Sequence, residues 1–203
     1  LALDTGVARF NLESRAELEL LQAIAAARGD TARASVRINP DVDARTHAKI
    51  STGKAENKFG VSIAEARRWF DAKAQWPAVQ LDGLHMHIGS QLLSLDPVRE
   101  ALQRMAAFWK ELAAAGHAIA SIDVGGGLGV RYREGEQAPD ASDYVAEIRA
   151  ALAGFEGRIL VEPGRWLVAE AGVLLSRVML VKEGEARRFL VLDAAMNDLL
   201  RPS

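Results

Sequence analysis

Short apolar runs alternate with longer helix-like stretches along most of this chain, and this alternation restricts its possible folds more than any other feature. Ser14 followed by Glu17 forms a capping box, which predicts a helix over 15–28 that ends at Gly29. Strands and helices joined by right-handed crossovers predict an α/β fold with a parallel sheet, either an open doubly wound sheet or a (β/α)8 TIM barrel. The expected strands are 9–12, 34–38, 80–88, 120–124 and 158–161, and the other expected helices are 63–74, 97–115 and 143–152.

The alternation stops near Gly172. Two further β runs, 173–181 and 188–193, are separated only by residues 182–187, a spacing typical of a hairpin rather than of a crossover helix. We therefore expect two domains. Residues 1–171 would carry about the last five strands of a barrel, and residues 172–203 would begin a C-terminal β domain.

The composition argues against several classes of function. A formal net charge of −2 provides no general attraction for nucleic acid or for an anionic membrane. No apolar run approaches the roughly 20 residues that are needed to span a bilayer. The absence of cysteine excludes disulfides, cysteine zinc sites and thiol catalysis within this sequence, and it fits a cytoplasmic protein.

Polar or glycine residues follow each of the five expected parallel strands. The triple glycine at 125–127 comes directly after one apolar run, and its bare main-chain amides would suit an anionic group. The Glu-Pro-Gly-Arg segment at 162–165 follows another run and adds a guanidinium beside a tight turn. Because the carboxyl ends of the strands meet at the mouth of a parallel barrel, these segments predict a phosphate-binding site at that mouth.

The triple glycine has a simpler explanation as a tight turn without a ligand. A single glycine normally suffices for such a turn, so three in a row indicate the close approach of another group. The segment also lacks the dinucleotide-binding fingerprint, because Gly127 and Gly129 are followed by Val130 and Arg131 rather than by the start of a helix.

His85 and His87 lie two residues apart on one face of their expected strand, a spacing that also occurs in metal sites. No third ligand is obvious nearby in the sequence, so we expect no metal. His87 as a flat ring against an aromatic cofactor, and His85 as ordinary core filling, are the preferred alternatives. Glu162 could be a surface carboxylate, but its place beside Gly164 and Arg165 favours contact with a cationic or protonated ligand atom.

Several motifs resemble those of the diaminopimelate decarboxylase family, in order and in spacing, over essentially the whole chain. The triple glycine is shared with ornithine and arginine decarboxylases of the same fold. The Asn-Pro-Asp-Val-Asp segment at 39–43, the Ser-Thr-Gly loop at 51–53 and the Asn-Lys-Phe-Gly segment at 57–60 are more specific in combination. The other matching segments are 46–47, 83–91, 123–129, 162–165 and 193–202.

The resemblance implies a fold type III pyridoxal-phosphate enzyme, in which an alanine-racemase-like barrel is followed by a β domain. His87 would stack on the pyridine ring and Glu162 would keep the ring nitrogen protonated, and these two are the expected catalytic residues. Arg165 and Arg201 would contact the carboxylates of the substrate. The implied cofactor-binding residues are His87, Ser90, Gly125, Gly126, Gly127, Glu162, Pro163, Gly164 and Arg165.

The implied reaction is the decarboxylation of meso-2,6-diaminoheptanedioate to L-lysine and CO2 in lysine biosynthesis, by a homodimer with its active site at the interface. In the family the Schiff-base lysine lies upstream of the segment that corresponds to Leu1, so we expect this sequence to be part of a longer protein and to be inactive alone. The alternatives are a related decarboxylase acting on ornithine, arginine or carboxynorspermidine, and a catalytically silent fragment that binds pyridoxal phosphate.

Overall fold

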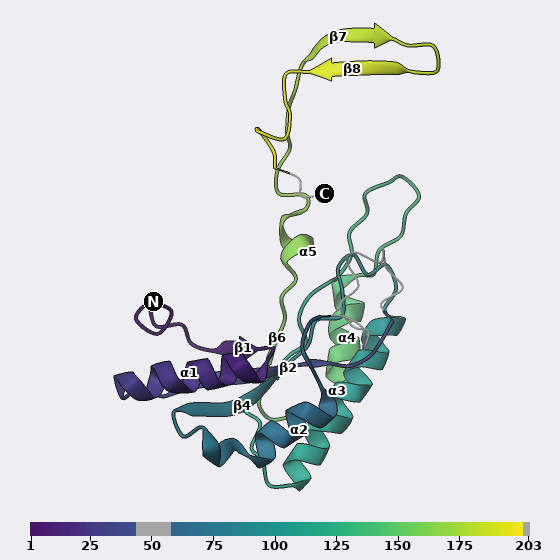
Figure 1. The fold of residues 1–203 in the computed structure, drawn as a ribbon. Helices are drawn as coiled ribbons and strands as arrows, with labels where there is room; N and C mark the ends of the chain where they lie inside the picture. Colours follow the sequence, from purple (N-terminus) through teal and green to yellow (C-terminus); the bar gives the residue numbers. More distant parts are fainter. Residues whose placement is uncertain (44–57, 201–203) are drawn as a thin grey trace. The chain divides into compact units, whose positions relative to one another are not determined.

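The computed structural model describes residues 1–43 and 58–200 (Figure 1). The chain divides into two compact units, Leu1–Leu167 and Val168–Ser203. In the first unit the strands are β1 (Phe10–Leu12), β2 (Ala32–Asn39), β3 (Val61–Ser62), β4 (Val79–His85), β5 (Ser121–Asp123) and β6 (Arg158–Leu160). The helices are α1 (Arg15–Arg28), α2 (Ile63–Asp71), α3 (Asp96–Ala114), α4 (Ala141–Ala151), the short α5 (Gly164–Val168) and a 3-10 turn (Lys73–Gln75).

The strands of the first unit form one parallel sheet in the order β1-β2-β4-β5-β6, with β3 pairing only with β2. This order follows the sequence from one edge to the other, so the reversal of strand order that marks a doubly wound sheet does not occur among the described strands. The predicted α/β fold with a parallel sheet is confirmed, and the strand order favours the barrel alternative.

Local capping signals position the first helix as the sequence predicts. The Ser14 hydroxyl accepts a hydrogen bond from the Glu17 N–H at 3.3 Å, and Gly29 ends α1 in the left-handed conformation with φ of 69°. Ser62 caps α2 in the same way by accepting from the Glu65 N–H at 3.1 Å. Helix α2 ends at Asp71, three residues before the predicted end, because the chain tightens there into the 3-10 turn.

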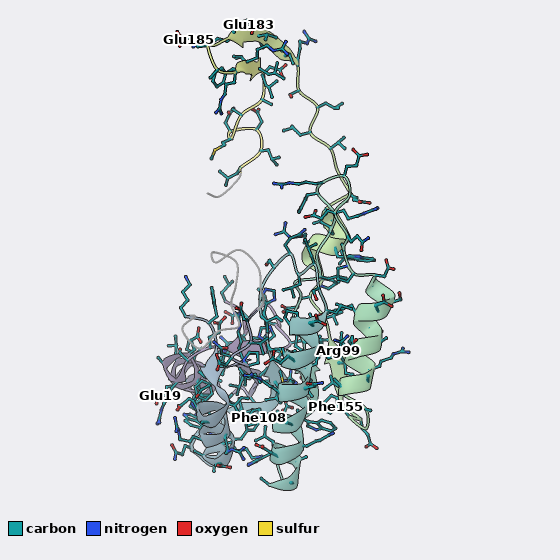
Figure 2. All side chains as sticks on the ribbon, turned by 90° about the vertical axis from the view of Figure 1, so that its right-hand side faces the viewer. Glu19, Arg99, Phe108, Phe155, Glu183 and Glu185 are labelled. Carbon is teal, nitrogen blue, oxygen red and sulfur yellow. The ribbon has the colours of Figure 1, made fainter. Side chains whose placement is uncertain are left out.

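The core of the first unit lies between the sheet and helices α1 to α4. Met105 and Phe108 of α3 are fully buried in it, as expected from their helical spacing. Trp109 is only partly buried and packs edge-on against Phe155, with ring centroids 5.1 Å apart; Phe108 and Phe155 are labelled in Figure 2. The helices therefore hold the strands from one side and leave the carboxyl ends of the strands to the loops.

Strand β4 contains a bulge that places an additional polar side chain in the sheet. Ala34 pairs with Leu81 and Ser35 with Gly83, so Asp82 is the extra residue. Its buried carboxylate accepts hydrogen bonds from Arg9 at 2.6 Å and from Arg33 at 2.9 Å. This ion-pair network joins β2 to β4 near their amino-terminal ends.

The second unit contains the antiparallel pair β7 (Val178–Glu183) and β8 (Arg188–Leu192), which confirms the predicted hairpin. The first strand begins at Val178 rather than at 173, because its pairing partner β8 ends at Leu192. Every residue of both strands is exposed. The further prediction that this unit begins a C-terminal β domain stays a prediction. Within the described residues, no helix is both long enough and apolar enough to cross a membrane.

Candidate active site at the carboxyl ends of the strands

The register of the sheet places three functional side chains in one row. Arg37 of β2 pairs with His85 of β4, and His85 pairs with Asp123 of β5. Asp123 in turn pairs with Leu160 of β6, and Glu162 lies two residues further along the chain. Since side chains alternate along a strand, residues two apart lie on the same face. The sheet thus gathers a guanidinium, an imidazole and two carboxylates at the ends of four strands.

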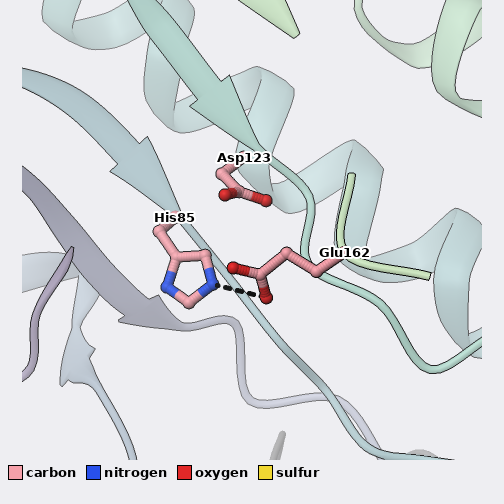
Figure 3. A group of neighbouring side chains, drawn as sticks. All are labelled: His85, Asp123 and Glu162. Carbon is pink, nitrogen blue, oxygen red and sulfur yellow. Dashed lines mark ion pairs between the residues drawn. The ribbon is translucent and has the colours of Figure 1, made fainter. Parts of the chain in front are cut away.

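His85, Asp123 and Glu162 form the centre of this cluster (Figure 3). The His85 Nε2 atom lies 3.6 Å from Glu162 Oε2, slightly beyond hydrogen-bond length, and one atom from each of the three side chains falls within 4.8 Å of the others. His85 is 5% exposed, whereas the Glu162 side chain is 47% exposed. Glu162 therefore connects a buried polar cluster to the open side of the sheet.

The two carboxylates differ in their affinity for a proton. The neighbouring His85 imidazole lowers the pKa of Glu162 and outweighs the opposing effect of partial burial. Burial raises the pKa of Asp123, although the Gly125 N–H that donates to its carboxylate acts in the opposite direction. Burial, together with the charges of Asp123 and Glu162, raises the pKa of Tyr144 to about 12. This arrangement favours an anionic Glu162.

The triple glycine is required by contacts between strand ends. A Cβ on Gly125 would lie 2.2 Å from the Met86 carbonyl oxygen, and one on Gly126 would lie 2.0 Å from the Glu162 carbonyl oxygen. Gly125 and Gly127 also have positive φ values, 70° and 100°, which favour glycine. The close approach that the sequence predicts is therefore real, but the groups that approach are backbone carbonyls of the protein itself.

Two of the three glycine amides are already hydrogen-bonded, which corrects the expectation of bare amides. The Gly125 N–H donates to Asp123 Oδ1 at 2.9 Å, and the Gly126 N–H donates to His87 Nδ1 at 3.2 Å. The first acceptor is the side chain two residues before Gly125, and the second is a side chain that follows the neighbouring strand β4. The Gly127 N–H has no hydrogen-bond partner among the described residues. An anion at this turn would consequently be bound mainly through Gly127.

His87 lies just beyond β4, which ends at His85 rather than at 88 because its neighbour β5 ends at Asp123. Its ring is partly buried, and its Nδ1 atom accepts the Gly126 N–H. Burial, followed by the nearby positive charge of Arg37, lowers the pKa of His87. The neutral imidazole is favoured, and hydrogen bonding fixes the direction of its ring.

Ser90 lies in a loop that is tied to the glycine turn. The Gln91 Oε1 atom accepts the Val130 N–H at 3.2 Å, and the Leu92 N–H donates to the Gly127 carbonyl oxygen at 2.8 Å. Ser90 is half-buried and directly precedes these two anchoring residues. The loop that carries the Ser90 hydroxyl therefore lies beside the segment that carries the Gly127 amide.

The 162–165 segment turns tightly after β6. The Gly164 N–H donates to the Glu162 carbonyl oxygen at 2.8 Å across Pro163, and Gly164 then begins α5. The Arg165 guanidinium donates to the Tyr132 hydroxyl at 2.6 Å and lies 5.7 Å from the centre of its ring. Arg165 thus has a partner that its sequence position does not reveal. The other predicted substrate contact, Arg201, lies outside the described residues, as does the 44–57 part of the specific motifs.

Sequence reasoning identified His87 and Glu162 as candidates but did not assign a role to Arg37 or Asp123. Arg37 forms an ion pair with Glu13 at 2.5 Å, with its guanidinium 5.0 Å from the centre of the Phe59 ring. Arg37 lies two residues before Asn39, the end of β2, and Asp123, the end of β5, lies two residues before Gly125. Side-chain alternation therefore puts each on the same face as a polar or glycine residue at the strand end. That alternation is the signal that could have found them. The expectation that no metal is bound stays a prediction, since the three side chains of the central cluster are close enough to share an ion.

Residues 1–169 match the family described as pyridoxal-dependent decarboxylase, pyridoxal binding domain, and the chain belongs to this family. Individual members of the family match the whole chain. The chain is 50% identical over 202 residues to the diaminopimelate decarboxylase of Pseudomonas aeruginosa and 45% identical over 203 residues to that of Zymomonas mobilis. In both comparisons the match covers 100% of this chain and 48% of the relative, so the chain spans about half the length of these relatives.

A solved structure of a diaminopimelate decarboxylase also resembles this chain in its fold. The crystal structure of diaminopimelate decarboxylase from Helicobacter pylori complexed with L-lysine superposes with a TM-score of 0.92 at 45% identity, covering 99% of this chain and 50% of that one. The fold is therefore that of the fold type III pyridoxal-phosphate decarboxylases, and pyridoxal phosphate is the cofactor that the family implies.

The described residues fit this cofactor. Its ring nitrogen carries a proton that an anionic carboxylate can hold, and Glu162 is a half-exposed carboxylate whose pKa is lowered by His85. Its aromatic ring needs a flat, neutral partner, and the fixed imidazole of His87 has these properties. Its phosphate needs donors, and the Gly127 amide is available for this.

Proposed function

We propose that the protein to which this chain belongs catalyses the decarboxylation of meso-2,6-diaminoheptanedioate to L-lysine and CO2, with pyridoxal phosphate as cofactor. The observation that carries the proposal is the similarity to diaminopimelate decarboxylases, which extends over the whole chain at 45% to 50% identity. The site supports it, because the anionic Glu162 and the neutral His87 lie together at the carboxyl ends of the strands.

Glu162 and His87 have separate tasks in this proposal. When bound, the cofactor supplies a protonated ring that accepts the electron pair left behind as the substrate carboxylate departs as CO2. The Glu162 carboxylate accepts a hydrogen bond from the ring nitrogen and keeps its proton in place. His87 packs against the ring, and the Gly126 N–H holds the imidazole in position.

The phosphate and substrate contacts are divided among the loops. The Gly127 amide, the Ser90 hydroxyl and the 163–165 turn bind the cofactor phosphate, whereas Gly125 and Gly126 let the neighbouring backbone segments approach and so shape the turn. Arg165 and Arg201 bind carboxylates of the substrate, a task that suits the planar and permanently charged guanidinium. The hydrogen bond from Arg165 to the Tyr132 hydroxyl helps to hold the guanidinium in place.

The remaining parts of the proposal concern the whole protein. We infer a cytoplasmic homodimer with its active site at the interface, in which a lysine outside this sequence binds the cofactor covalently. L-lysine as product places the enzyme in lysine biosynthesis. Residues 1–171 supply five strands of the cofactor-binding barrel, and residues 172–203 begin the β domain that follows it.

The test uses the protein expressed from its complete gene. Purified protein is scanned for the absorbance of a lysine-bound pyridoxal cofactor at about 420 nm, and CO2 release is then measured with diaminoheptanedioate, ornithine, arginine and carboxynorspermidine. The proposal requires the band and a clear preference for diaminoheptanedioate, with L-lysine as the product. Preference for another amino acid would replace the substrate assignment. A band without CO2 release from any of the four would indicate a silent cofactor-binding protein.

A further inference from the structure

His85 is a buried polar side chain whose two nitrogen atoms have no hydrogen-bond partner among the described residues. Leaving a buried donor or acceptor unpaired costs about 1–3 kcal/mol per group, so such atoms usually mark a functional contact. The expected role of His85 as ordinary core filling does not account for its polar ring. An apolar side chain would fill the same space without this cost.

The imidazole is directed toward Glu162. Its Nε2 atom lies 3.6 Å from Glu162 Oε2, so a small movement of either side chain produces a hydrogen bond (Figure 3). Glu162 follows a strand that ends at Leu160 and is held there by its backbone, since the Glu162 N–H donates to the Gly125 carbonyl oxygen at 2.7 Å. The carboxylate itself is half-exposed, and it lies at ion-pair distance from His85.

The groups around this contact come from every neighbouring element of the sheet. Arg37 of β2 lies beside His85 in the row, Asp123 of β5 lies on its other side, and His87 follows on the same chain segment. Tyr144 of α4 is close enough for the charges of Asp123 and Glu162 to act on its hydroxyl. Asp123 accepts the Gly125 N–H, which fixes its carboxylate against the glycine turn.

We propose that His85 is a positioning residue: its Nε2–H holds the Glu162 carboxylate in the orientation that receives the protonated ring nitrogen of the cofactor. The inference rests on the proposed function, because it assigns Glu162 to the ring nitrogen. What it adds to that function is that the orientation of the Glu162 carboxylate depends on the buried imidazole of His85, two residues before His87. The lowered pKa of Glu162, caused chiefly by His85, agrees with this geometry.

The experiment compares the binding of two cofactors to the protein expressed from its complete gene. Pyridoxal phosphate and its 1-deaza analogue have the same shape, but the analogue has a C–H in place of the ring nitrogen. The ratio of their dissociation constants therefore measures the contact between Glu162 and the ring nitrogen, independently of turnover. A hydrogen bond to a charged group corresponds to a ratio of about tenfold or more in favour of pyridoxal phosphate.

Three substitutions of similar size separate positioning from packing. His85→Gln can present an amide donor near the position of Nε2, His85→Asn presents one near Nδ1, and His85→Leu presents none. We expect His85→Gln to retain the tenfold preference, and His85→Asn and His85→Leu to reduce it to about twofold or less. The Gln and Asn variants differ by one methylene, so a comparison between them does not depend on whether His85→Leu folds. Thermal melting of each variant records any general loss of packing.

Each outcome has a definite meaning. An unchanged preference in His85→Asn, or an equal weakening of both cofactors in all three variants, overturns the inference and leaves His85 a packing residue. A stoichiometric metal ion in the wild-type protein, lost in every His85 variant, also overturns it, because the cluster would then bind that ion. Absence of any preference in the wild-type protein refutes the assignment of Glu162 itself. Failure of the proposed function is therefore distinct from failure of the inference.

Discussion

Gly126 lies so close to Glu162 that a Cβ on the glycine would stand 2.0 Å from the Glu162 carbonyl oxygen. The two residues follow neighbouring strands, β5 and β6, and their backbones meet where the site is built. The glycine turn thereby determines how far the Glu162 segment can approach the strand beside it. A change at Gly126 should consequently affect both folding stability and the position of the Glu162 carboxylate.

We expect Gly126→Ala to lower the free energy of unfolding by about 1–3 kcal/mol, because the contact is with backbone and cannot be relieved by rotating a side chain. Gly164→Ala is the matched control, since its Cβ would meet nothing within 4 Å, and it should change stability by less than about 0.5 kcal/mol. Urea unfolding of both variants gives the comparison. Equal stability of the two variants would show that the backbone yields at Gly126.

Glu162→Gln should keep the cofactor bound but reduce decarboxylation by orders of magnitude, because a neutral amide no longer holds the ring-nitrogen proton. Absorbance of the bound cofactor and single-turnover CO2 release are measured on the same sample. Glu156→Gln removes an exposed carboxylate just before β6 and should leave both quantities unchanged. Near wild-type turnover in Glu162→Gln would remove the role assigned to this carboxylate.

Asp82→Ala should destabilise the protein by about 3 kcal/mol or more, because it leaves the largely buried Arg9 guanidinium without its carboxylate partner. The control is Glu19→Ala, which breaks an exposed ion pair with Arg15 on α1 and should cost less than about 1 kcal/mol. Both values come from denaturant unfolding at one pH. A small effect at Asp82 would mean that water replaces the carboxylate inside the sheet.

Stability should fall as the pH decreases below about 6.5, in part through His87. Burial and Arg37 lower the pKa of His87 from an ordinary value of 6.5, so the unfolded chain binds a proton at a higher pH than the folded protein does. The contribution of His87 is complete above about 6.5 and is lost as the pH falls toward the folded pKa. In His87→Phe, which keeps a flat ring, the difference in unfolding free energy between about pH 8 and about pH 5.5 should become smaller. An unchanged difference would place the titration on other groups.

Local signals made helix α1 predictable to the residue, because its capping serine and terminal glycine both lie in the sequence beside it. The end of β4 was overestimated by three residues, since it depends on where β5 ends and not on the apolar run itself. A strand can continue only as far as its neighbours provide hydrogen-bond partners. That information is non-local and is absent from the run 80–88.

In the candidate site, too, some features follow from the local sequence and others depend on how the strands pair. The strand-end positions of His87 and Glu162 were visible in the sequence, because polar residues after apolar runs indicate the mouth of a parallel barrel. The contact between His85 and Glu162 was not, because it depends on the register across β4, β5 and β6. The hydrogen bond from the Gly126 amide to His87 was hidden for the same reason, as it joins residues 39 positions apart.

At the bulge, β4 has one residue more than the neighbouring strand β2. The extra residue, Asp82, contributes a carboxylate, and the next residue, Gly83, has no side chain. A Cβ on Gly83 would stand 2.2 Å from Ser35 Oγ and 2.4 Å from the Arg9 guanidinium. A side chain at position 83 would therefore collide with the Arg9 guanidinium that Asp82 binds. A relative with a one-residue alignment gap at 82 should carry a side chain at 83 and lack the guanidinium at 9. We therefore expect the extra residue of β4 and the ion pair between Arg9 and Asp82 to be present together or absent together.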